Sequence, residues 1–358
     1  MQLNRTIHFH LHTPLLDGAP VNIAGTFNDW NQNEYPMHLD HPGHYSLSIN
    51  IPWDDAHPIE YKFLRGTWEN VELDEYGGGV SNRLMIDPQE PVNAYVPRWR
   101  NHGLTCDAGM MPLIQFHSVK LPRSRKERRV SVLLPYDYHQ SHKRYPVLYL
   151  MDGQNLFEDG APFGSWSIHK RLAVLAEKHK HEIIIVAIDH AGVKRVEEYS
   201  YINNTAMDSN RGHQFLDWIT VKLKPMIDGE YRTLEDQSHT GIGGSSMGGL
   251  ISLLAGTVYP HVFGKLMIFS PSLWKIVHLL YDRTMYLPLV SNNQSIYLYA
   301  GGREAGNMKG FTEDFFKRLN EFSTSDHHQY HYTFNERGKH NEKYWGSEFP
   351  RALKFLFF

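Results

Sequence analysis

The strongest candidates for a catalytic group surround Ser246, at the centre of the segment Gly244-Ser245-Ser246-Met247-Gly248. A Gly-x-Ser-x-Gly pattern is typical of a nucleophilic serine on a sharp turn between a strand and a helix. Its surroundings suit such a turn, because an apolar approach at 241–242 precedes it and an apolar, helix-like segment follows at 250–255. Glycines flank the serine because the turn leaves no room for side chains. The same pattern also occurs in strand-to-helix turns without catalytic function, so the flanking chain must decide.

A serine nucleophile needs a base, an acid that orients the base, and donors for the developing oxyanion. In hydrolases built around this turn, the acid and the histidine follow the serine in the chain. Glu304 comes just after a strand-like segment at 295–300, and His340 lies between another at 329–334 and the last helical segment. Both side chains would then lie at the carboxyl end of a strand. We therefore predict a triad of Ser246, Glu304 and His340.

The elements needed to position these residues are present from residue 113 onward. Buried strand-like runs, apolar on both faces, alternate there with helical patterns, which predicts an α/β fold with a central, mostly parallel sheet. Besides the strand before Ser246, strands are expected at 130–134, 146–151, 183–188, 265–269, 295–300 and 329–334. Helices are expected at 172–178, 214–227, 247–259, 310–322 and 344–357.

The N-terminal part has a different rhythm, with short alternating segments separated by turns, which predicts a small all-β sandwich. We expect the sandwich at 1–87, a Pro-containing linker at 88–112 and the α/β domain at 113–358. His8, His10 and His12 share one strand face. We interpret them as a polar exposed face rather than a metal site, and predict no metal and no organic cofactor.

Four motifs of the sandwich follow one another at 24–31, 60–63, 66–68 and 81–83. Their order and separations resemble the immunoglobulin-like glycogen-binding modules of AMP-activated protein kinase and starch-branching enzymes. The resemblance implies a glycan site of two tryptophans, a lysine and an asparagine, here Trp30, Trp68, Lys62 and Asn82. Indole rings would stack on a pyranose while the polar side chains bond its hydroxyls. Modules of this type can also serve only as a lid or spacer, so polysaccharide binding stays an expectation.

Further ordered motifs lie at 145–155, 195–199, 225–233, 269–274 and 338–345, around the Ser246 segment. Together they resemble the putative-esterase branch of the α/β-hydrolases, which includes enterochelin esterases, feruloyl and acetyl carbohydrate esterases, S-formylglutathione hydrolases and mycolyltransferases. The resemblance implies Ser246 as nucleophile, His340 as base, and the Gln154 and Met247 amides as oxyanion donors. Many relatives carry Asp where this chain has Glu304, so Asp326 remains an alternative acid.

Four more residues are candidates for the surroundings of the substrate. Asp152 lies on the loop before the serine, which suits an orienting role, and Arg195 belongs to a matched motif. Trp166 and Trp274 are candidates for the wall of an acyl or aryl pocket, although a tryptophan at a helix start is as often part of the core.

Composition excludes several classes of function. The 358 residues carry a net charge of −3 without a basic block, so no nucleic-acid partner is expected. The single cysteine, Cys106, excludes an internal disulfide and a thiolate metal site. No apolar run suits a signal peptide or a membrane span, so we expect a cytoplasmic protein without membrane contact.

The sequence thus predicts a serine carboxylic-ester hydrolase that acts through an acyl-enzyme on a small-molecule or oligosaccharide ester. Two substrate classes compete, an acyl or feruloyl ester of a carbohydrate and a siderophore trilactone. The loops expected to set specificity, 152–165, 189–212 and 271–293, hold more acids than bases. This favours an uncharged sugar ester over a strongly anionic trilactone. A non-catalytic glycan-binding protein is the alternative of another class.

Overall fold

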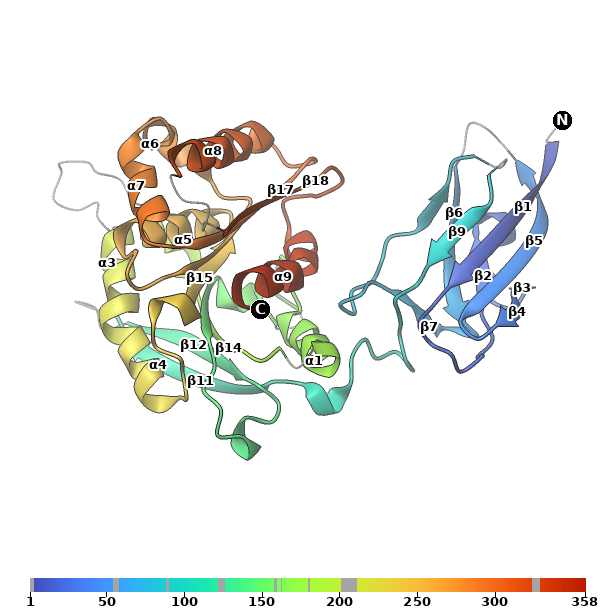
Figure 1. The fold of residues 1–358 in the computed structure, drawn as a ribbon, viewed down its shortest axis with the longest axis horizontal. Coiled ribbons are helices and arrows are strands. Elements are labelled where there is room, and N and C mark those ends of the chain that lie inside the picture. The colour runs from blue at the N-terminus through green and yellow to red at the C-terminus, as the bar shows by residue number, and fades with distance from the viewer. Residues whose placement is uncertain are drawn as a thin grey trace. The chain divides into compact units, whose positions relative to one another are not determined.

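The structure of the protein is a computed structural model that describes residues 3–53, 58–87, 90–121, 126–157, 160–161, 163–179, 181–200, 211–323 and 329–358. The chain divides into two compact units, Met1–Met110 and Met111–Phe358. Figure 1 colours the first unit blue to cyan and the second from green to red. The first is all β and the second is mixed α/β, which confirms the predicted fold class.

The first unit is a β-sandwich whose two sheets share one core. One sheet has the order β4-β5-β1-β9, and the other has β10-β7-β6-β2-β3 with β8 beside β6. Phe9 of one sheet packs edge-on against Tyr61 of the other, with ring centroids 5.4 Å apart. The strands are β1 (Leu3–His12), β2 (Asn22–Gly25), β3 (Tyr35–Pro36), β4 (His38–His41), β5 (His44–Trp53), β6 (Ile59–Arg65), β7 (Thr67–Leu73), β8 (Arg83–Met85), β9 (Val92–Tyr95) and β10 (Arg98–Trp99).

Part of the predicted linker belongs to this sandwich. β9 runs parallel to β1, and β10 pairs antiparallel with β7. Trp99 of β10 is buried, and its Nε1 donates a hydrogen bond of 2.9 Å to Thr13 Oγ1. The linker prediction is therefore wrong for 92–99, because strands of four and two residues are too short to show a period in the sequence.

The histidines of β1 lie on the outer face of the first sheet. His8, His10 and His12 are all exposed, because they alternate with the buried Ile7, Phe9 and Leu11. The ring of His12 stacks on the ring of His44 across the β1–β5 pair, at a centroid distance of 4.5 Å. This placement agrees with the interpretation of a polar exposed face.

The second unit is built on one sheet of order β11-β12-β14-β13-β15-β16-β17-β18. β11 and β12 are antiparallel to their neighbours, and the strands β13 to β18 are all parallel to one another. Their carboxyl ends therefore meet at one edge of the sheet. The strands are β11 (Leu113–Lys120), β12 (Glu127–Leu134), β13 (Val147–Met151), β14 (Ile184–Ile188), β15 (Thr240–Ser245), β16 (Lys265–Phe269), β17 (Ser295–Gly301) and β18 (Gln329–Asn335).

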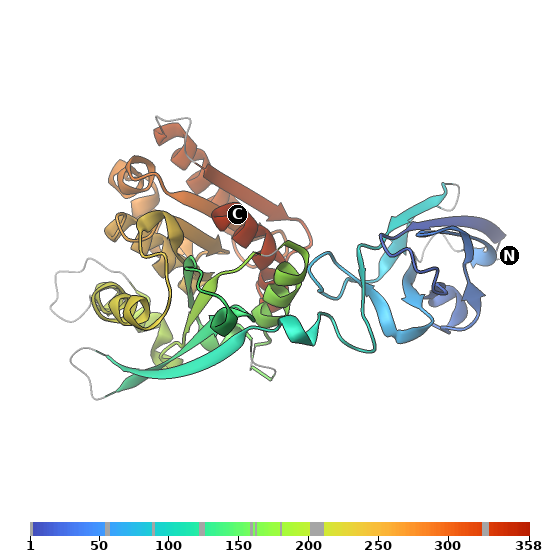
Figure 2. The same ribbon diagram turned by 60° about the horizontal axis from the view of Figure 1, so that its bottom comes forward.

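Helices cover this sheet so completely that every residue of β13, β14, β15 and β17 is buried. This explains why these strands are apolar on both faces. α1 packs against α9, while α7 packs against both α5 and α8 (Figures 1 and 2). The helices are α1 (Ile168–His179), α2 (Arg195–Glu198), α3 (Arg211–Trp218), α4 (Lys224–Glu230), α5 (Met247–Val258), α6 (Val277–Leu280), α7 (Arg283–Ser291), α8 (Met308–Phe322) and α9 (Glu342–Phe357).

The long helix predicted at 214–227 has an irregular centre. A π-helical stretch at Ile219–Leu223 joins α3 directly to α4. Across the described part of the chain, none of the helices combines the length and the apolar character required to cross a bilayer.

Candidate active site

Ser246 occupies a sharp turn between β15 and α5, with φ 55° and ψ −121°. Such a backbone costs a non-glycine residue about 1–3 kcal/mol, so its neighbours must hold it in place. Its N–H donates to Phe269 O at 2.9 Å, and Ser272 N–H donates to Ser246 O at 3.1 Å. A Cβ on Gly248 would lie 2.7 Å from Asp152 Oδ2, so this position requires glycine. The geometry is that of a nucleophile elbow.

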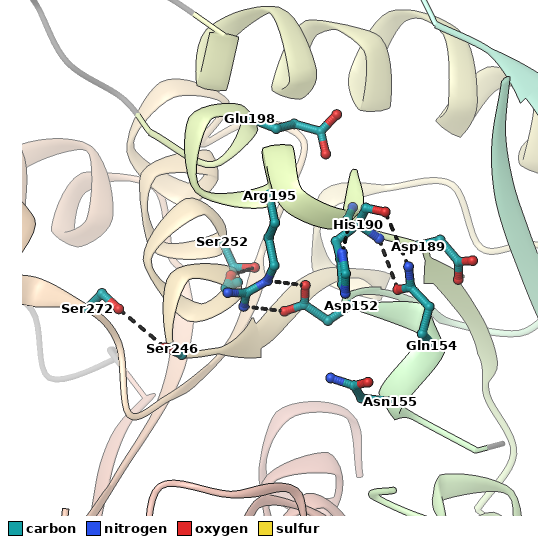
Figure 3. Close-up of polar contacts among 12 residues, drawn as sticks. Asp152, Gln154, Asn155, Asp189, His190, Arg195, Glu198, Ser246, Ser252 and Ser272 are labelled. Carbon is teal, nitrogen blue, oxygen red and sulfur yellow. Dashed lines mark hydrogen bonds and ion pairs between the residues drawn. The ribbon is translucent and has the colours of Figure 1, made fainter. Parts of the chain in front are cut away.

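The hydroxyl of Ser246 contacts a second serine. Its Oγ lies 3.4 Å from Ser272 Oγ (Figure 3). No hydrogen bond joins Ser246 to His340 among the residues that the structure describes. In enzymes that activate a serine, the bond between nucleophile and base is often long until substrate binds.

The predicted acid and base are in direct contact. His340 Nδ1 and Glu304 Oε2 are 2.9 Å apart, and the carboxylate of Glu304 is fully buried. Its other oxygen, Oε1, accepts from the Gly301 N–H at 2.8 Å and from the Ser270 hydroxyl at 2.6 Å. These three bonds satisfy a carboxylate that is removed from water. They also leave His340 Nε2 available for a proton from the nucleophile.

Ser270 and Trp345 fix this pair. Ser270 comes directly after β16, donates to Glu304, and accepts a bond of 2.9 Å from Trp345 Nε1. The ring of Trp345 meets the His340 ring edge-on, with centroids 4.8 Å apart. The sequence analysis did not identify this positioning role of Ser270. Asp326, the alternative acid, lies outside the described residues.

The two expected oxyanion donors lie at the starts of helical turns. Met247 is the first residue of α5, and Gln154 lies in the 3₁₀ turn Gly153–Asn155 after β13. Backbone amides at such positions have no acceptor within their own helix. The Gln154 side chain also holds its loop, since Nε2 donates to His190 O at 3.2 Å and Oε1 accepts from His190 N–H at 3.0 Å. The loops after β13 and β14 are therefore tied together.

Asp152 and Arg195 form an ion pair beside the elbow. Arg195 reaches from α2 and donates to Asp152 through Nε at 2.6 Å and a terminal nitrogen at 2.7 Å (Figure 3). Burial lowers the pKa of Arg195, but the hydrogen bonds and charge of Asp152 outweigh it, so the pKa is raised. Asp152 is itself buried and has φ 60°. This contact suits the orienting role expected of Asp152 and engages the Arg195 guanidinium in an ion pair.

The two tryptophans predicted near the pocket differ in environment. Trp166 is 2% exposed and stacks on Phe269 at a centroid distance of 5.4 Å, so it belongs to the core and its prediction as a pocket wall is wrong. Trp274 lies in the 3₁₀ turn Leu273–Ile276 after β16 and is 45% exposed.

Glu342 was missed by the sequence analysis. It begins α9, is 7% exposed, and accepts a hydrogen bond of 3.2 Å from Asn155 Nδ2 on the oxyanion loop. Burial raises the pKa of Glu342 above the usual range of a glutamate. The available signal was its position two residues after His340, behind the helix cap Asn341. This contact joins the loop that carries His340 to the loop that carries Gln154.

Two of the expected glycan-binding residues lie on paired strands of the first unit, Lys62 on β6 and Trp68 on β7. The rings of Trp30 and Trp68 are 6.0 Å apart and tilted by 48°, and Trp68 is 36% exposed. Lys62 Nζ donates to Val80 O at 2.6 Å, and Asn82 Nδ2 donates to Glu60 Oε2 at 2.7 Å. The structure therefore brings the two tryptophans together, while both polar side chains already have partners.

The second unit combines a mostly parallel sheet, a serine elbow and a buried carboxylate–histidine pair, which is the architecture of an α/β-hydrolase. The sequence model of the putative esterase family matches residues 122–356, and the chain belongs to this family. The protein is therefore a carboxylic ester hydrolase, and the alternative of a purely non-catalytic glycan-binding protein is set aside.

Several known proteins are similar to this chain in sequence or in fold. The uncharacterized protein YbbA of Bacillus subtilis (strain 168) is 22% identical over 246 residues, which are 64% of this chain and 92% of YbbA. The enterobactin esterase FES from Shigella flexneri matches with a TM-score of 0.56 and 17% identity, over 99% of this chain and 93% of FES. A ferulic acid esterase matches with a TM-score of 0.54 and 18% identity, over 69% of this chain and 98% of its own. Similarities at these identities show the fold that the structures share.

The contacts of Ser270 generate a prediction. Ser270→Ala removes a hydrogen bond to the Glu304 carboxylate and leaves the Trp345 N–H without its acceptor. Loss of a bond to a charged group is worth about 1.5–3 kcal/mol, so we expect kcat to fall about tenfold or more while KM stays nearly constant. Steady-state kinetics on a short p-nitrophenyl ester measures this.

The matched control is Ser252→Ala, another buried serine, whose hydroxyl donates to Gly248 O within α5. We expect this change to leave kcat nearly unchanged. If both variants lose kcat equally, the effect of Ser270 is general to buried serines and its positioning role is wrong.

Proposed function

We propose that the protein is a serine esterase in which Ser246 is the nucleophile, His340 the base and Glu304 the acid. The observation that carries the proposal is the continuous set of hydrogen bonds from Trp345 through Ser270 and Glu304 to His340. It lies at the carboxyl edge of the sheet, where the elbow also presents Ser246.

The reaction follows from this arrangement. Ser246 Oγ attacks the ester carbonyl carbon while His340 Nε2 takes the hydroxyl proton. The oxyanion that forms accepts hydrogen bonds from the Met247 and Gln154 amides. Collapse of this intermediate expels the alcohol, which receives the proton from His340 and leaves an acyl-enzyme. Water repeats the sequence and releases the acid, while Glu304 remains ionised and stabilises the imidazolium.

We infer that the substrate is an acyl or feruloyl ester of a carbohydrate. Two bases of the loop 189–212 already have partners, because Arg195 is engaged by Asp152 and Arg211 by Glu197. Neither is therefore available for a strongly anionic trilactone. The exposed ring of Trp274 suits the apolar face of an aryl group or a sugar. The ferulic acid esterase with the same fold is consistent with this class.

A siderophore trilactone is the second candidate. The observation that favours it is the extent of the match to the enterobactin esterase, which spans both units of this chain. The two candidates share the same triad and differ only in what lies beyond the ester.

Replacement of the nucleophile tests the triad. Ser246→Ala should leave folding intact and lower kcat on a p-nitrophenyl ester about a millionfold, while Glu304→Gln should cost about a thousandfold or more and leave a residual rate. Circular dichroism and steady-state kinetics measure both. Substantial activity in purified Ser246→Ala contradicts the assignment of the nucleophile. A larger loss in Asp326→Asn than in Glu304→Gln assigns the acid to Asp326.

A direct comparison of substrates tests the class of ester. We expect kcat/KM for methyl ferulate or an acetylated oligosaccharide to exceed that for apo- or ferric enterobactin by at least about tenfold, because two of the loop bases, Arg195 and Arg211, are already paired. A preference for the trilactone reverses the choice of substrate and leaves the triad standing.

The first unit generates a separate prediction. Trp30→Ala and Trp68→Ala should each weaken retention on glycogen, starch or xylan about tenfold, since each removes one stacking ring. Tyr95→Ala is the control, because Tyr95 is an exposed aromatic residue on the other sheet of the same unit. Affinity electrophoresis measures the retention. Equal retention by all variants means that the tryptophans do not bind these polysaccharides.

A further inference from the structure

The outer face of the first sheet in the first unit carries a row of aromatic rings that crosses all four strands. His41 of β4 pairs in register with His44 of β5. His12 of β1 pairs with His44 on one side and with Tyr95 of β9 on the other. Neighbouring rings are in contact, with centroid distances of 4.0, 4.5 and 5.3 Å from β4 to β9. Three steps of about 4.8 Å between strands make this row about 14 Å long.

Histidines recur in the next two rows of the same face. Ser46 of β5 pairs with His38 on one side and with His10 on the other. His8 pairs with Ser48 and shares a hydrogen bond of 2.8 Å with its hydroxyl. The face therefore combines imidazole rings with hydroxyl groups. Five of its histidines are exposed, and the sixth, His44, is half-buried; the five are His8, His10, His12, His38 and His41.

This face becomes positively charged only when its histidines are protonated. Among the residues of β1, β4, β5 and β9, the only carboxylate is Asp40 and the only permanent cation is Arg5. Arg5 falls at an inward position of the β1 alternation, and Asp40 lies 3.9 Å from His38 Nε2. In the loop that follows β1, Asp17 is paired with Arg65 at 2.5 Å. Because histidine changes its charge between about pH 5 and 8, the face gains several positive charges over this range.

The row itself opposes the protonation of its rings. Burial lowers the pKa of His44, the neighbouring rings of His41 and His12 lower it further, and Asp40 acts in the opposite direction. Like charges directly opposite each other on paired strands destabilise a sheet. A row of protonated rings therefore needs counter-charges from outside, and a bound anion would supply them.

The chemistry of the face favours one class of anion. Stacked rings cover part of one another, so the row offers mainly ring edges, where the nitrogens lie, rather than a flat surface for a neutral sugar. Nucleic-acid phosphates are bound by lysine and arginine, and the outward positions of these four strands hold neither. Among the described residues, no group of three or more histidines, cysteines or carboxylates is arranged for a metal ion. The step between strands, about 4.8 Å, is close to the length of one sugar unit.

We propose that the outer face of the first sheet binds an acidic polysaccharide whose sugars carry carboxylates, with successive carboxylates at the protonated rings of His41, His44 and His12. The surface is separate from the tryptophans discussed above, since Trp68 lies on β7 of the other sheet. The choice of a polysaccharide rests on the proposed function, because a carbohydrate esterase acts on such polymers. An acidic polymer also carries neutral ester groups, so it is compatible with the uncharged ester inferred for the second unit.

Calorimetry with the full chain tests this surface, with polygalacturonate as the probe and carboxyl-reduced polygalacturonate as its neutral counterpart. We expect saturable binding of polygalacturonate at about pH 5.5 and at least about tenfold weaker binding at about pH 8. The neutral polymer should bind at least about tenfold more weakly at about pH 5.5, without dependence on pH. EDTA in all buffers removes bridging metal ions.

Proton uptake is the signature of this mode of binding. Carboxylates favour the protonated form of the rings that they contact, so the complex binds more protons than the free protein. The affinity should therefore be greatest at low pH and fall as the pH rises. At about pH 6.5 we expect uptake of about one proton or more for each bound segment of polymer. Heats of binding in buffers with different ionisation enthalpies measure this uptake.

Replacement of the row gives the decisive variants. His12→Gln/His44→Gln should weaken the binding of polygalacturonate at about pH 5.5 at least about tenfold. His41→Gln, on the edge strand β4, leaves the central strands intact and should weaken it about threefold or more. The matched control is His102→Asn, because the exposed His102 donates its N–H to Asn70 of β7 in the other sheet, and asparagine tolerates its φ of 46°. The control should bind as the wild type does.

Equal affinity at the two pH values, or equal affinity in the wild type and both row variants, overturns the proposal. So does an equal loss in His102→Asn, because it would indicate attraction by net charge alone. Tighter binding of a DNA duplex or of anionic lipid vesicles through the same histidines assigns the face to another class of partner and overturns the choice of polysaccharide. These outcomes do not depend on turnover. A protein that binds polygalacturonate but does not hydrolyse p-nitrophenyl acetate keeps this surface and loses the proposed triad, and one that hydrolyses the ester without binding the polymer loses only the surface.

Discussion

The backbone of Ser246 is held in an unfavourable conformation by hydrogen bonds at its N–H and at its carbonyl oxygen, and the catalytic edge is arranged around this constraint. Phe269 O accepts from its N–H, and the Ser272 N–H donates to its carbonyl, so both partners come from the end of β16 or the turn after it. The same turn exposes the hydroxyl and starts α5 at Met247, which leaves one amide free of intrahelical bonding. Strain at one residue thus positions a nucleophile and an oxyanion donor together.

Buried charges join the loops around this turn. Removing a carboxylate from water is costly unless hydrogen bonds and an opposite charge compensate for it. Asp152 and Glu198 are each held by an arginine, and Glu304 is held by a histidine, a hydroxyl and an amide. Because removal of one partner would leave the other uncompensated, these pairs give each loop one preferred position. The sheet brings the loops to one edge, and the charged pairs fix the positions of the loops relative to one another there.

Signals that repeat along the chain predicted most of the fold, and contacts between distant segments were the part that the sequence could not show. Apolar runs located the parallel strands because covered strands are apolar on both faces. Chain order located Glu304 and His340, whose contact is seen in the structure. The pairing of Ser270 with Trp345 and of Glu342 with Asn155 spans 75 and 187 residues, and no local pattern encodes such contacts. The prediction of Trp166 as a pocket wall was wrong for the same reason, since its burial against Phe269 depends on packing between distant segments.

The polar contacts of the first unit limit how it could bind sugar. Lys62 and Asn82 already donate to Val80 O and to Glu60, so a sugar hydroxyl must compete with these acceptors and gains little net free energy from replacing them. The tilted rings of Trp30 and Trp68 lose no such partner when a pyranose stacks on them. On the proposed function, the affinity would therefore come mainly from two rings, which is a weak interaction. Weak attachment raises the local concentration of ester on a polymer and still allows release after hydrolysis, so a low affinity would serve an esterase better than a tight one.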